Sequence, residues 1–283
     1  MPDERRIRGV GGVGLAVRVW PDGAGAPFVL VHGLASSARL WDGVAAELQA
    51  LGHPVAALDQ RGHGQSDKPT RGYDFATVTS DLVAVIDGIG FDRPVLAGQS
   101  WGGNVVLDLA WRRPDLMRGI VCVDGGTIEL KRRFRRWGTV AHAMAPPTLT
   151  GTTRRELEDR ITALHPDWPD AGIAGVMACF EDLPDGTVRA RLSRDNHLEI
   201  LRHLWKHRPS RLYADIKVPV LLLPADDGHT DWGPDKRAGV DAAAAAIPHA
   251  RVHWFTADHD VHAQHPDQVA AVMHAATEDG FLA

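Results

Sequence analysis

The residues best suited to chemistry are a serine and its neighbours in Gly98-Gln99-Ser100-Trp101-Gly102. An apolar run over 94–98 precedes the serine and a helix-like segment over 101–112 follows it, so the pattern predicts a sharp strand-to-helix turn that exposes the hydroxyl. The flanking glycines allow a tight turn, and the first amides of the helix can stabilise a developing negative charge. This context predicts that Ser100 is a nucleophile.

Two upstream segments also follow predicted strands. Leu30-Val31-His32-Gly33-Leu34 ends one strand with a His-Gly loop, and Asp59-Gln60-Arg61-Gly62-His63-Gly64-Gln65-Ser66 forms a glycine-rich polar turn after the next. Together with the serine motif, in this order, these residues resemble the α/β-hydrolase superfamily over nearly the whole chain, and least in segment 126–212. The resemblance implies an oxyanion hole made by the backbone amides of Leu34 and Trp101.

The resemblance also implies a general base late in the chain, where residues 252–266 contain four histidines. Members of the family commonly read G-H-x-x-x-x-E-x-P here. Placing Pro266 on the motif's proline makes His259 the base, with Gln264 in the place of the glutamate. His259 would take the proton of Ser100 and return it to the leaving group. His262 is expected on the pocket wall.

The acid of the triad has two candidates. In the family it usually follows the strand predicted at 219–224 in a G-x-x-D pattern, but Ala225 and Gly228 stand at the glycine and acid positions. A shifted loop would allow Asp227 to serve. Some members carry the acid at the end of the preceding strand, where this chain has Asp124. Because the usual acid position is a glycine, we favour Asp124 over Asp227.

These residues predict hydrolysis of a small, partly apolar ester or lactone through an acyl-serine intermediate. C–C bond hydrolysis, perhydrolysis and hydroxynitrile cleavage use the same Ser–His pair and stay open, and a non-catalytic ligand receptor is less favoured. Haloalkane dehalogenases and epoxide hydrolases use an aspartate nucleophile, which Ser100 argues against. Candidate substrate contacts, each of which could equally pack segment 126–212, are Trp137, Met144, Trp168 and Trp205.

The elements that must hold these residues alternate between short apolar runs and longer amphipathic segments, which predicts an α/β fold with a mostly parallel sheet flanked by helices. Segment 126–212 looks helical throughout, so we expect a helical cap inserted into a core of 1–125 and 213–283. The predicted strands are 15–20, 27–32, 54–59, 94–98, 118–123, 219–224 and 251–255, and the predicted helices are 39–52, 75–89, 101–112, 236–247 and 265–277.

Composition excludes several classes of protein. The 283 residues are 44% hydrophobic, enough for a sizeable core. The net charge of −5 argues against a nucleic-acid or membrane-surface partner. Neither a secretory leader nor an apolar run of about 18 residues is evident. We expect a soluble cytoplasmic protein that acts on a small molecule, as a monomer or a homodimer.

Metal and cofactor chemistry is not expected, although the chain has 15 histidines. The spacing of His259, His262 and His265 suggests zinc at first sight. A zinc site needs three or four convergent ligands, and the sequence has no HExxH or CxxC pattern to supply them. With only two cysteines, a disulfide framework is not expected either.

Overall fold

An eight-stranded sheet runs through the computed structural model, which describes residues 1–229 and 232–283. Its strands lie in the order β1-β2-β4-β3-β5-β6-β9-β10. The pairs from β4 to β10 are parallel, whereas β1 and β2 form an antiparallel edge. The strands are β1 Asp3–Arg8, β2 Gly14–Trp20, β3 Phe28–Val31, β4 Val55–Leu58, β5 Val95–Gln99, β6 Ile120–Val123, β9 Val220–Leu223 and β10 Ala250–Val252.

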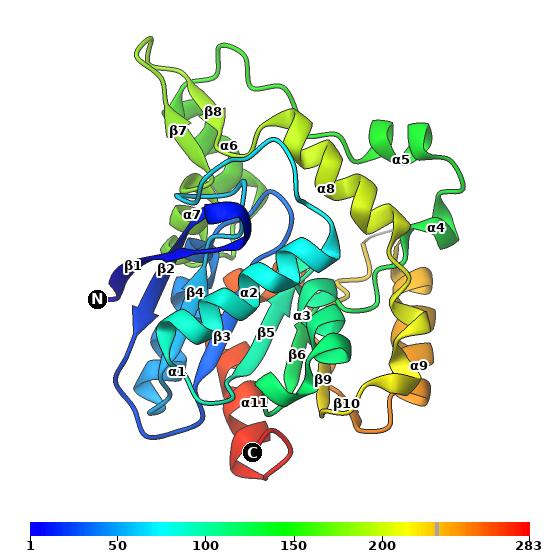
Figure 1. Ribbon diagram of the computed structural model, residues 1–283. Coiled ribbons are helices and arrows are strands. Elements are labelled where there is room, and N and C mark those ends of the chain that lie inside the picture. The colour runs from blue at the N-terminus through cyan, green and yellow to red at the C-terminus, as the bar shows by residue number, and fades with distance from the viewer. Residues whose placement is uncertain (230–231) are drawn as a thin grey trace.

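Helices cover both faces of this sheet (Figure 1). Val29 and Val31 of β3 pack in one hydrophobic cluster with α2, α3 and α9, whereas Phe28 and Leu30 pack in a second with α1 and α11. Burial on both faces explains why these strands read as continuous apolar runs. None of the described helices has the length and apolar character needed to cross a membrane. The helices of these two layers are α1 Asp42–Ala50, α2 Phe75–Ile89, α3 Trp101–Arg112, α9 Gly233–Ala246 and α11 Pro266–Glu278, and the short α10 Val261–Gln264 precedes α11.

The predicted fold class is confirmed, but β1 was not predicted. Its sequence, Asp-Glu-Arg-Arg-Ile-Arg, has one apolar residue and no strand-like run. It pairs only with β2, at the edge of the sheet. Charged residues on an edge strand discourage pairing with other chains. The strand prediction depended on apolar runs, and β1 has no such run.

Between β6 and β9 the chain leaves the sheet and covers one end of it (Figure 1). The prediction that this segment is helical throughout is wrong at one place, because β7 and β8 form an antiparallel hairpin. Each strand has three residues, too few to show a period. The elements of the segment are α4 Leu130–Arg133, α5 Trp137–Ala143, α6 Arg154–Leu164, α7 Asp170–Met177, β7 Phe180–Asp182, β8 Val188–Ala190 and α8 Arg194–Lys206.

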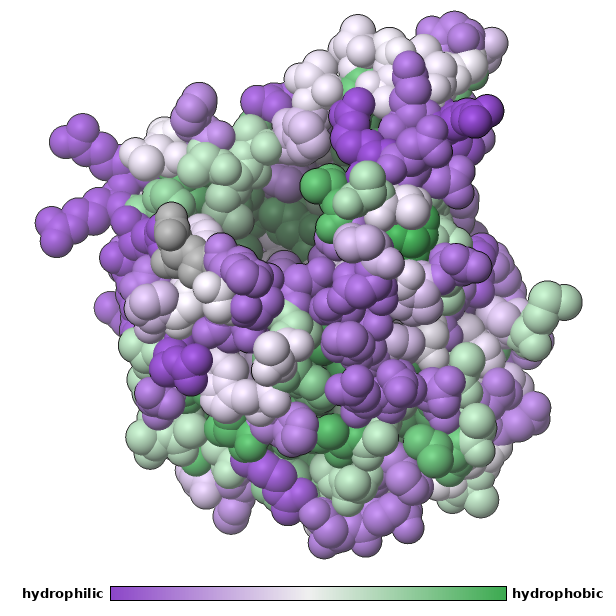
Figure 2. Space-filling view, turned by 180° about the vertical axis from the view of Figure 1, so that it is seen from behind, coloured by the Kyte–Doolittle hydropathy of each residue, from purple (hydrophilic) through white to green (hydrophobic). Residues whose placement is uncertain are grey.

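The segment is packed on the sheet layers in two different ways. Residues of α8 and α5, among them Val140 and Ile200, belong to the same cluster as α2 and α3. Those of α6, α7 and β8 form a smaller cluster with Leu40 and Ala263 from the body of the molecule. Seen from behind, the molecule is hollowed beneath its upper part, and hydrophobic residues line the hollow (Figure 2).

Candidate active site

Ser100 occupies a strained turn between β5 and α3. Its φ of 53° and ψ of −119° lie where few residues other than glycine are found. A Cβ on Gly98 would lie 2.2 Å from the carbonyl oxygen of Gly102, and a Cβ on Gly102 would lie 2.3 Å from that of Val31. Both positions therefore require glycine, and the close packing holds the serine at the carboxyl end of the sheet.

His259 and Asp124 complete a hydrogen-bonded chain with this serine. Nε2 of His259 lies 2.9 Å from Oγ of Ser100, and its Nδ1 lies 2.5 Å from Oδ2 of Asp124. Asp124 follows β6, again with a positive φ, of 40°, and its side chain is buried. The three side chains come from the ends of β5 and β6 and from the loop before α10. This geometry allows His259 to take a proton from the serine while the carboxylate orients the ring.

Lys236 of α9 supports the carboxylate from the other side. Its Nζ donates to Oδ2 of Asp124 at 2.7 Å and to the carbonyl oxygen of Ala225 at 2.5 Å. The backbone amide of Ala225 in turn donates to Oδ1 of Asp124 at 3.1 Å. Both oxygens of the buried acid are thus held by donors, and its orientation toward the histidine is fixed.

The charged groups next to Ser100 shift the pKa of Asp124 and the pKa of His259. Burial alone would raise the pKa of Asp124, but the hydrogen bond and charge of His259, with the charge of Lys236, lower it. Burial lowers the pKa of His259, but the hydrogen bond and charge of Asp124 outweigh it, and the pKa is raised. The carboxyl group is therefore ionised and the imidazole is a stronger base than usual.

Asp227, the second acid candidate, does not contact His259. Its Oδ1 accepts a hydrogen bond from the backbone amide of His229 at 2.8 Å. The loop after β9 instead reaches the site through Ala225, which holds Asp124. The structure therefore brings Asp124, and not Asp227, to the histidine.

The predicted oxyanion donors flank the serine. Leu34 lines the pocket that contains Ser100, and Trp101 is the first residue of α3, where a helix leaves its amides unpaired. Within the described residues, neither amide donates to a backbone or side-chain acceptor. The indole ring of Trp101 is fully buried and stacks on His63 with centroids 5.6 Å apart. Only its backbone amide is available to the site.

His32 and Asp59 shape the loops around these donors. Nε2 of His32 accepts from the backbone amide of Gln60 at 3.0 Å, so Nδ1 carries the proton and donates to the carbonyl oxygen of Gly33 at 2.7 Å. Burial lowers the pKa of His32 to about 4, which keeps the ring neutral. The carboxylate of Asp59 accepts from the amides of Ala38 and Gln65. Both side chains act on the backbone rather than on a substrate.

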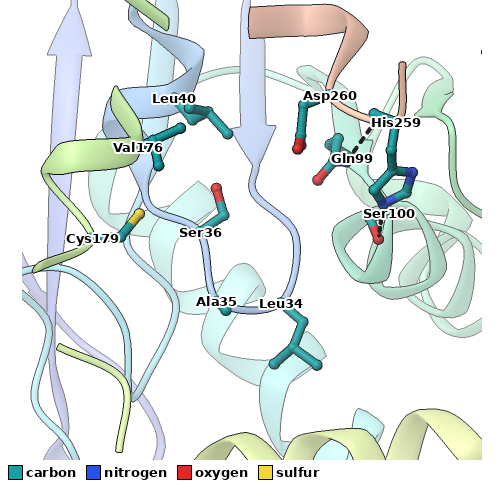
Figure 3. A pocket seen from close by; sticks show the side chains of 10 residues that line it. All are labelled: Leu34, Ala35, Ser36, Leu40, Gln99, Ser100, Val176, Cys179, His259 and Asp260. Atoms are coloured by element: carbon teal, nitrogen blue, oxygen red, sulfur yellow. Dashed lines mark hydrogen bonds between the residues drawn. The ribbon is translucent and has the colours of Figure 1, made fainter. Parts of the chain in front are cut away.

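A pocket of about 150 Å³ opens beside Ser100 and His259 (Figure 3). This is the size of an engineered protein cavity that binds benzene, so it accommodates roughly six non-hydrogen atoms. One wall comes from the loop after β3 and another from the segment between β6 and β9. Its lining residues are Leu34, Ala35, Ser36, Leu40, Gln99, Ser100, Val176, Cys179, His259 and Asp260.

The structure does not bring the predicted substrate contacts to this pocket. Trp137 and Trp205 pack on each other, with centroids 5.9 Å apart, and Met144 packs at the edge of the main cluster. Trp168 is buried, and its Nε1 donates to Oδ2 of Asp258 at 2.9 Å. His262 is fully buried against Trp41 rather than on the wall. Aromatic content suggested a pocket lining, but these side chains instead pack the segment and attach it to the body.

Sequence reasoning also missed residues that the fold brings to the site. Lys236 lies 112 positions from Asp124, and nothing in its local pattern distinguishes it from a solvent-exposed lysine of a helix. Ser36, Cys179 and Asp260 line the pocket but belong to no motif. Asp260 is next to the predicted base, which is the one signal that could have singled it out. Across residues 1–229 and 232–283, no group of three or more His, Cys, Asp or Glu side chains could hold a metal ion.

Known proteins resemble this chain in sequence and in structure. Residues 26–152 match a family model described as the alpha/beta hydrolase fold. An uncharacterised protein of Mycobacterium tuberculosis is 32% identical over 208 residues, 68% of this chain, and the chain spans 58% of that protein's length. Epoxide hydrolase B of the same organism is 35% identical over 103 residues, which are 36% of this chain and 29% of the length of that enzyme. The crystal structure of E-2-(acetamidomethylene)succinate hydrolase superposes with a TM-score of 0.79 at 23% identity. The superposition covers 98% of this chain and 100% of the hydrolase chain.

Proposed function

Because this chain belongs to the α/β-hydrolase superfamily and links Ser100, His259 and Asp124 by hydrogen bonds, we propose that it is a serine hydrolase of small carboxylic esters or lactones. The observation that carries the proposal is the distance of 2.9 Å between Nε2 of His259 and Oγ of Ser100. This is hydrogen-bond reach for a base that removes the serine proton. The substrate class of the whole protein is likewise a proposal.

In the first half of the reaction, Ser100 attacks the carbonyl carbon as His259 takes its proton. The amides of Leu34 and Trp101 hold the oxygen that becomes negative, a contact whose loss typically costs about 10²–10³ in rate. His259 then gives the proton to the leaving alkoxide, and the acyl group remains on the serine. Ionised Asp124 stabilises the imidazolium throughout.

In the second half, His259 removes a proton from water, which attacks the acyl-serine. His259 then returns the proton to Oγ of Ser100 as the acid leaves. A pocket near 150 Å³ supports a short acyl or alcohol group over a long lipid chain. An epoxide opening of the kind named for the Mycobacterium relative is disfavoured, because the superfamily's epoxide hydrolases use aspartate where this chain has Ser100.

Labelling with a fluorophosphonate tests the nucleophile directly. We expect intact-mass analysis to show one adduct, located on Ser100, and Ser100→Ala to show none. Turnover should be measured on short and long p-nitrophenyl esters and on a panel of lactones, with the short esters preferred. An unlabelled wild-type protein that hydrolyses none of these compounds would overturn the proposal.

A further inference from the structure

Three side-chain oxygen atoms face the pocket beside Ser100. Figure 3 shows the carboxyl group of Asp260, the hydroxyl of Ser36 and the side-chain oxygen of Gln99 directed into the same space. Nε2 of Gln99 donates to the carbonyl oxygen of His259 at 3.2 Å, so the amide oxygen is the atom left facing the pocket. Leu40 and Val176 add apolar surface on the side of Ser36, across the space from Asp260 and Gln99 (Figure 3).

These oxygens lack partners within the protein. Among the hydrogen bonds and ion pairs of the described residues, none involves the carboxylate of Asp260, whose backbone alone is engaged. Oγ of Ser36 is buried without a hydrogen-bond partner. A buried polar group without a partner costs about 1–3 kcal/mol, which applies to the Ser36 hydroxyl. The oxygens of Asp260 and Gln99 add two acceptors that face the same small space, and together they favour a ligand that brings a donor.

The surroundings of Asp260 add a preference of charge. The neighbouring groups that act most on the titration of Asp260 are His259, Asp258, His165 and Asp124, and two of these four are acidic. Burial, ahead of these neighbours, raises the pKa of Asp260. A carboxylate on the ligand would be repelled here, whereas a hydroxyl or an ammonium group would supply the missing donor.

We propose that Asp260, with Ser36 and Gln99, selects a short substrate group that carries a hydrogen-bond donor, a hydroxyl or an ammonium, and rejects one that carries a carboxylate. This inference rests on the proposed ester hydrolysis, because it assigns the group bound next to the scissile carbonyl. Asp260 is thereby a specificity-determining residue rather than a member of the triad. Roughly six non-hydrogen atoms of room limit the group to about the size of a butanoyl chain.

Four ethyl esters that share a four-carbon acyl group test the assignment: butanoate, 3-hydroxybutanoate, 3-aminobutanoate and monoethyl succinate. Acid release is followed by pH-stat at one neutral pH, and kcat/KM is compared between esters within each protein. Ratios within one protein cancel any general effect of Asp260 on its neighbour His259. In the wild type we expect the hydroxyl or the ammonium ester to be fastest and the succinate ester slowest. The two donor esters distinguish an alcohol from an amine as the natural group.

Asp260→Asn should lower the ratio of the ammonium ester to the succinate ester by about tenfold or more, since it removes a charged hydrogen-bond partner. Asp260→Ala should in addition remove the preference for the hydroxyl ester over butanoate. Asp267→Asn in the first turn of α11 is the control, because it removes one negative charge from a carboxylate outside the pocket lining, and its ratios should equal those of the wild type. A wild type without donor preference, or the same preference in Asp260→Asn, would overturn the inference while leaving ester hydrolysis intact.

A binding measurement decides the case in which the wild type hydrolyses no ester and the proposed function fails. Ligand-observed NMR should detect n-propylammonium binding to the wild type, weaker binding to Asp260→Asn, and no comparable binding of propanoate. Equal binding of n-propylammonium to both proteins would overturn the inference independently of any activity.

Discussion

At the scale of single residues, the site depends on a buried acid whose two carboxylate oxygens both accept hydrogen bonds. Asp124 accepts from His259, from the backbone amide of Ala225 and from Lys236. Such an acid cannot rotate away from the histidine without leaving a buried donor unpaired, which is costly. Asp227 has no comparable connection to the base, since its carboxylate accepts from the backbone of its own loop.

The two acids should therefore respond differently to the same substitution. We expect Asp124→Asn to lower kcat by roughly 10⁴-fold, the scale known for loss of a triad acid, because the amide favours the wrong tautomer of His259. Asp227→Asn should leave kcat near that of the wild type. Steady-state kinetics on one good ester measures both, and the reverse order of effects would reassign the acid.

The pH dependence of the reaction should report the raised pKa of His259. Only the neutral ring can accept the serine proton, so kcat/KM should fall as the pH decreases through a value above that of an ordinary histidine. Lys236 is a positive charge that lowers this pKa. Lys236→Met should move the acid limb of the pH–rate profile to higher pH, and Lys236→Arg, which keeps the charge, should leave it in place. A limb that Lys236→Met does not move would contradict the proposed coupling.

At the scale of elements, the turn from β5 to α3 works because helix and sheet approach without side chains between them. A Cβ on Gly102 would lie 2.3 Å from the carbonyl oxygen of Val31 and 2.6 Å from that of His32. These carbonyls belong to β3 and to the loop that presents the amide of Leu34, so one contact positions both proposed oxyanion donors.

Widening that contact should weaken both stability and catalysis. Gly102→Ala should cost roughly 1–3 kcal/mol in the free energy of unfolding, as overpacking does. It should also lower kcat by about 10²-fold, because a shift near 1 Å misplaces the Trp101 amide. Gly138→Ala in α5 is the control, since its Cβ would meet nothing within 4 Å. The denaturation midpoint and kcat should both fall in Gly102→Ala, and both should stay unchanged in Gly138→Ala.

At the scale of the whole molecule, the body supplies the reacting groups and the segment between β6 and β9 supplies a wall of the pocket. Val176 and Cys179 of that segment face Ser100 across the cavity. The segment is attached to the body next to His259, where Nε1 of Trp168 donates to Asp258. The mutual position of wall and base thus depends on this indole hydrogen bond, on a hydrogen bond from Nε2 of Gln264 to Asp167, and on the apolar contacts around them.

Loss of the indole hydrogen bond should loosen the loop that carries His259. We expect Trp168→Phe to reduce hydrogen-exchange protection over residues 256–265 and to lower kcat/KM. Trp205→Phe removes a comparable bond, to the carbonyl oxygen of Phe134, that lies entirely within the segment. It should leave the protection of 256–265 unchanged. Equal loss of protection in both variants would show that the segment acts as a whole rather than through Trp168.

The sequence by itself determined the alternation of strands and helices, the serine turn and the late histidine. Each depends on neighbours in the chain: apolar runs for buried strands, glycines at 98 and 102 for the turn, and a proline at 266 that places the base. The charged edge strand and the three-residue strands of the hairpin were missed because short or charged strands carry no hydrophobic period.

Only the tertiary structure decided which acid meets the histidine, which residues line the pocket and which tryptophans do not. Lys236, Asp260 and Ser36 become neighbours of the site through contacts between distant segments, and a local pattern cannot encode such contacts. Trp137, Trp168 and Trp205 were candidates for the pocket because large aromatic rings serve equally in binding and in packing. Their positions in the fold, against each other and against the loop of His259, assign them to packing.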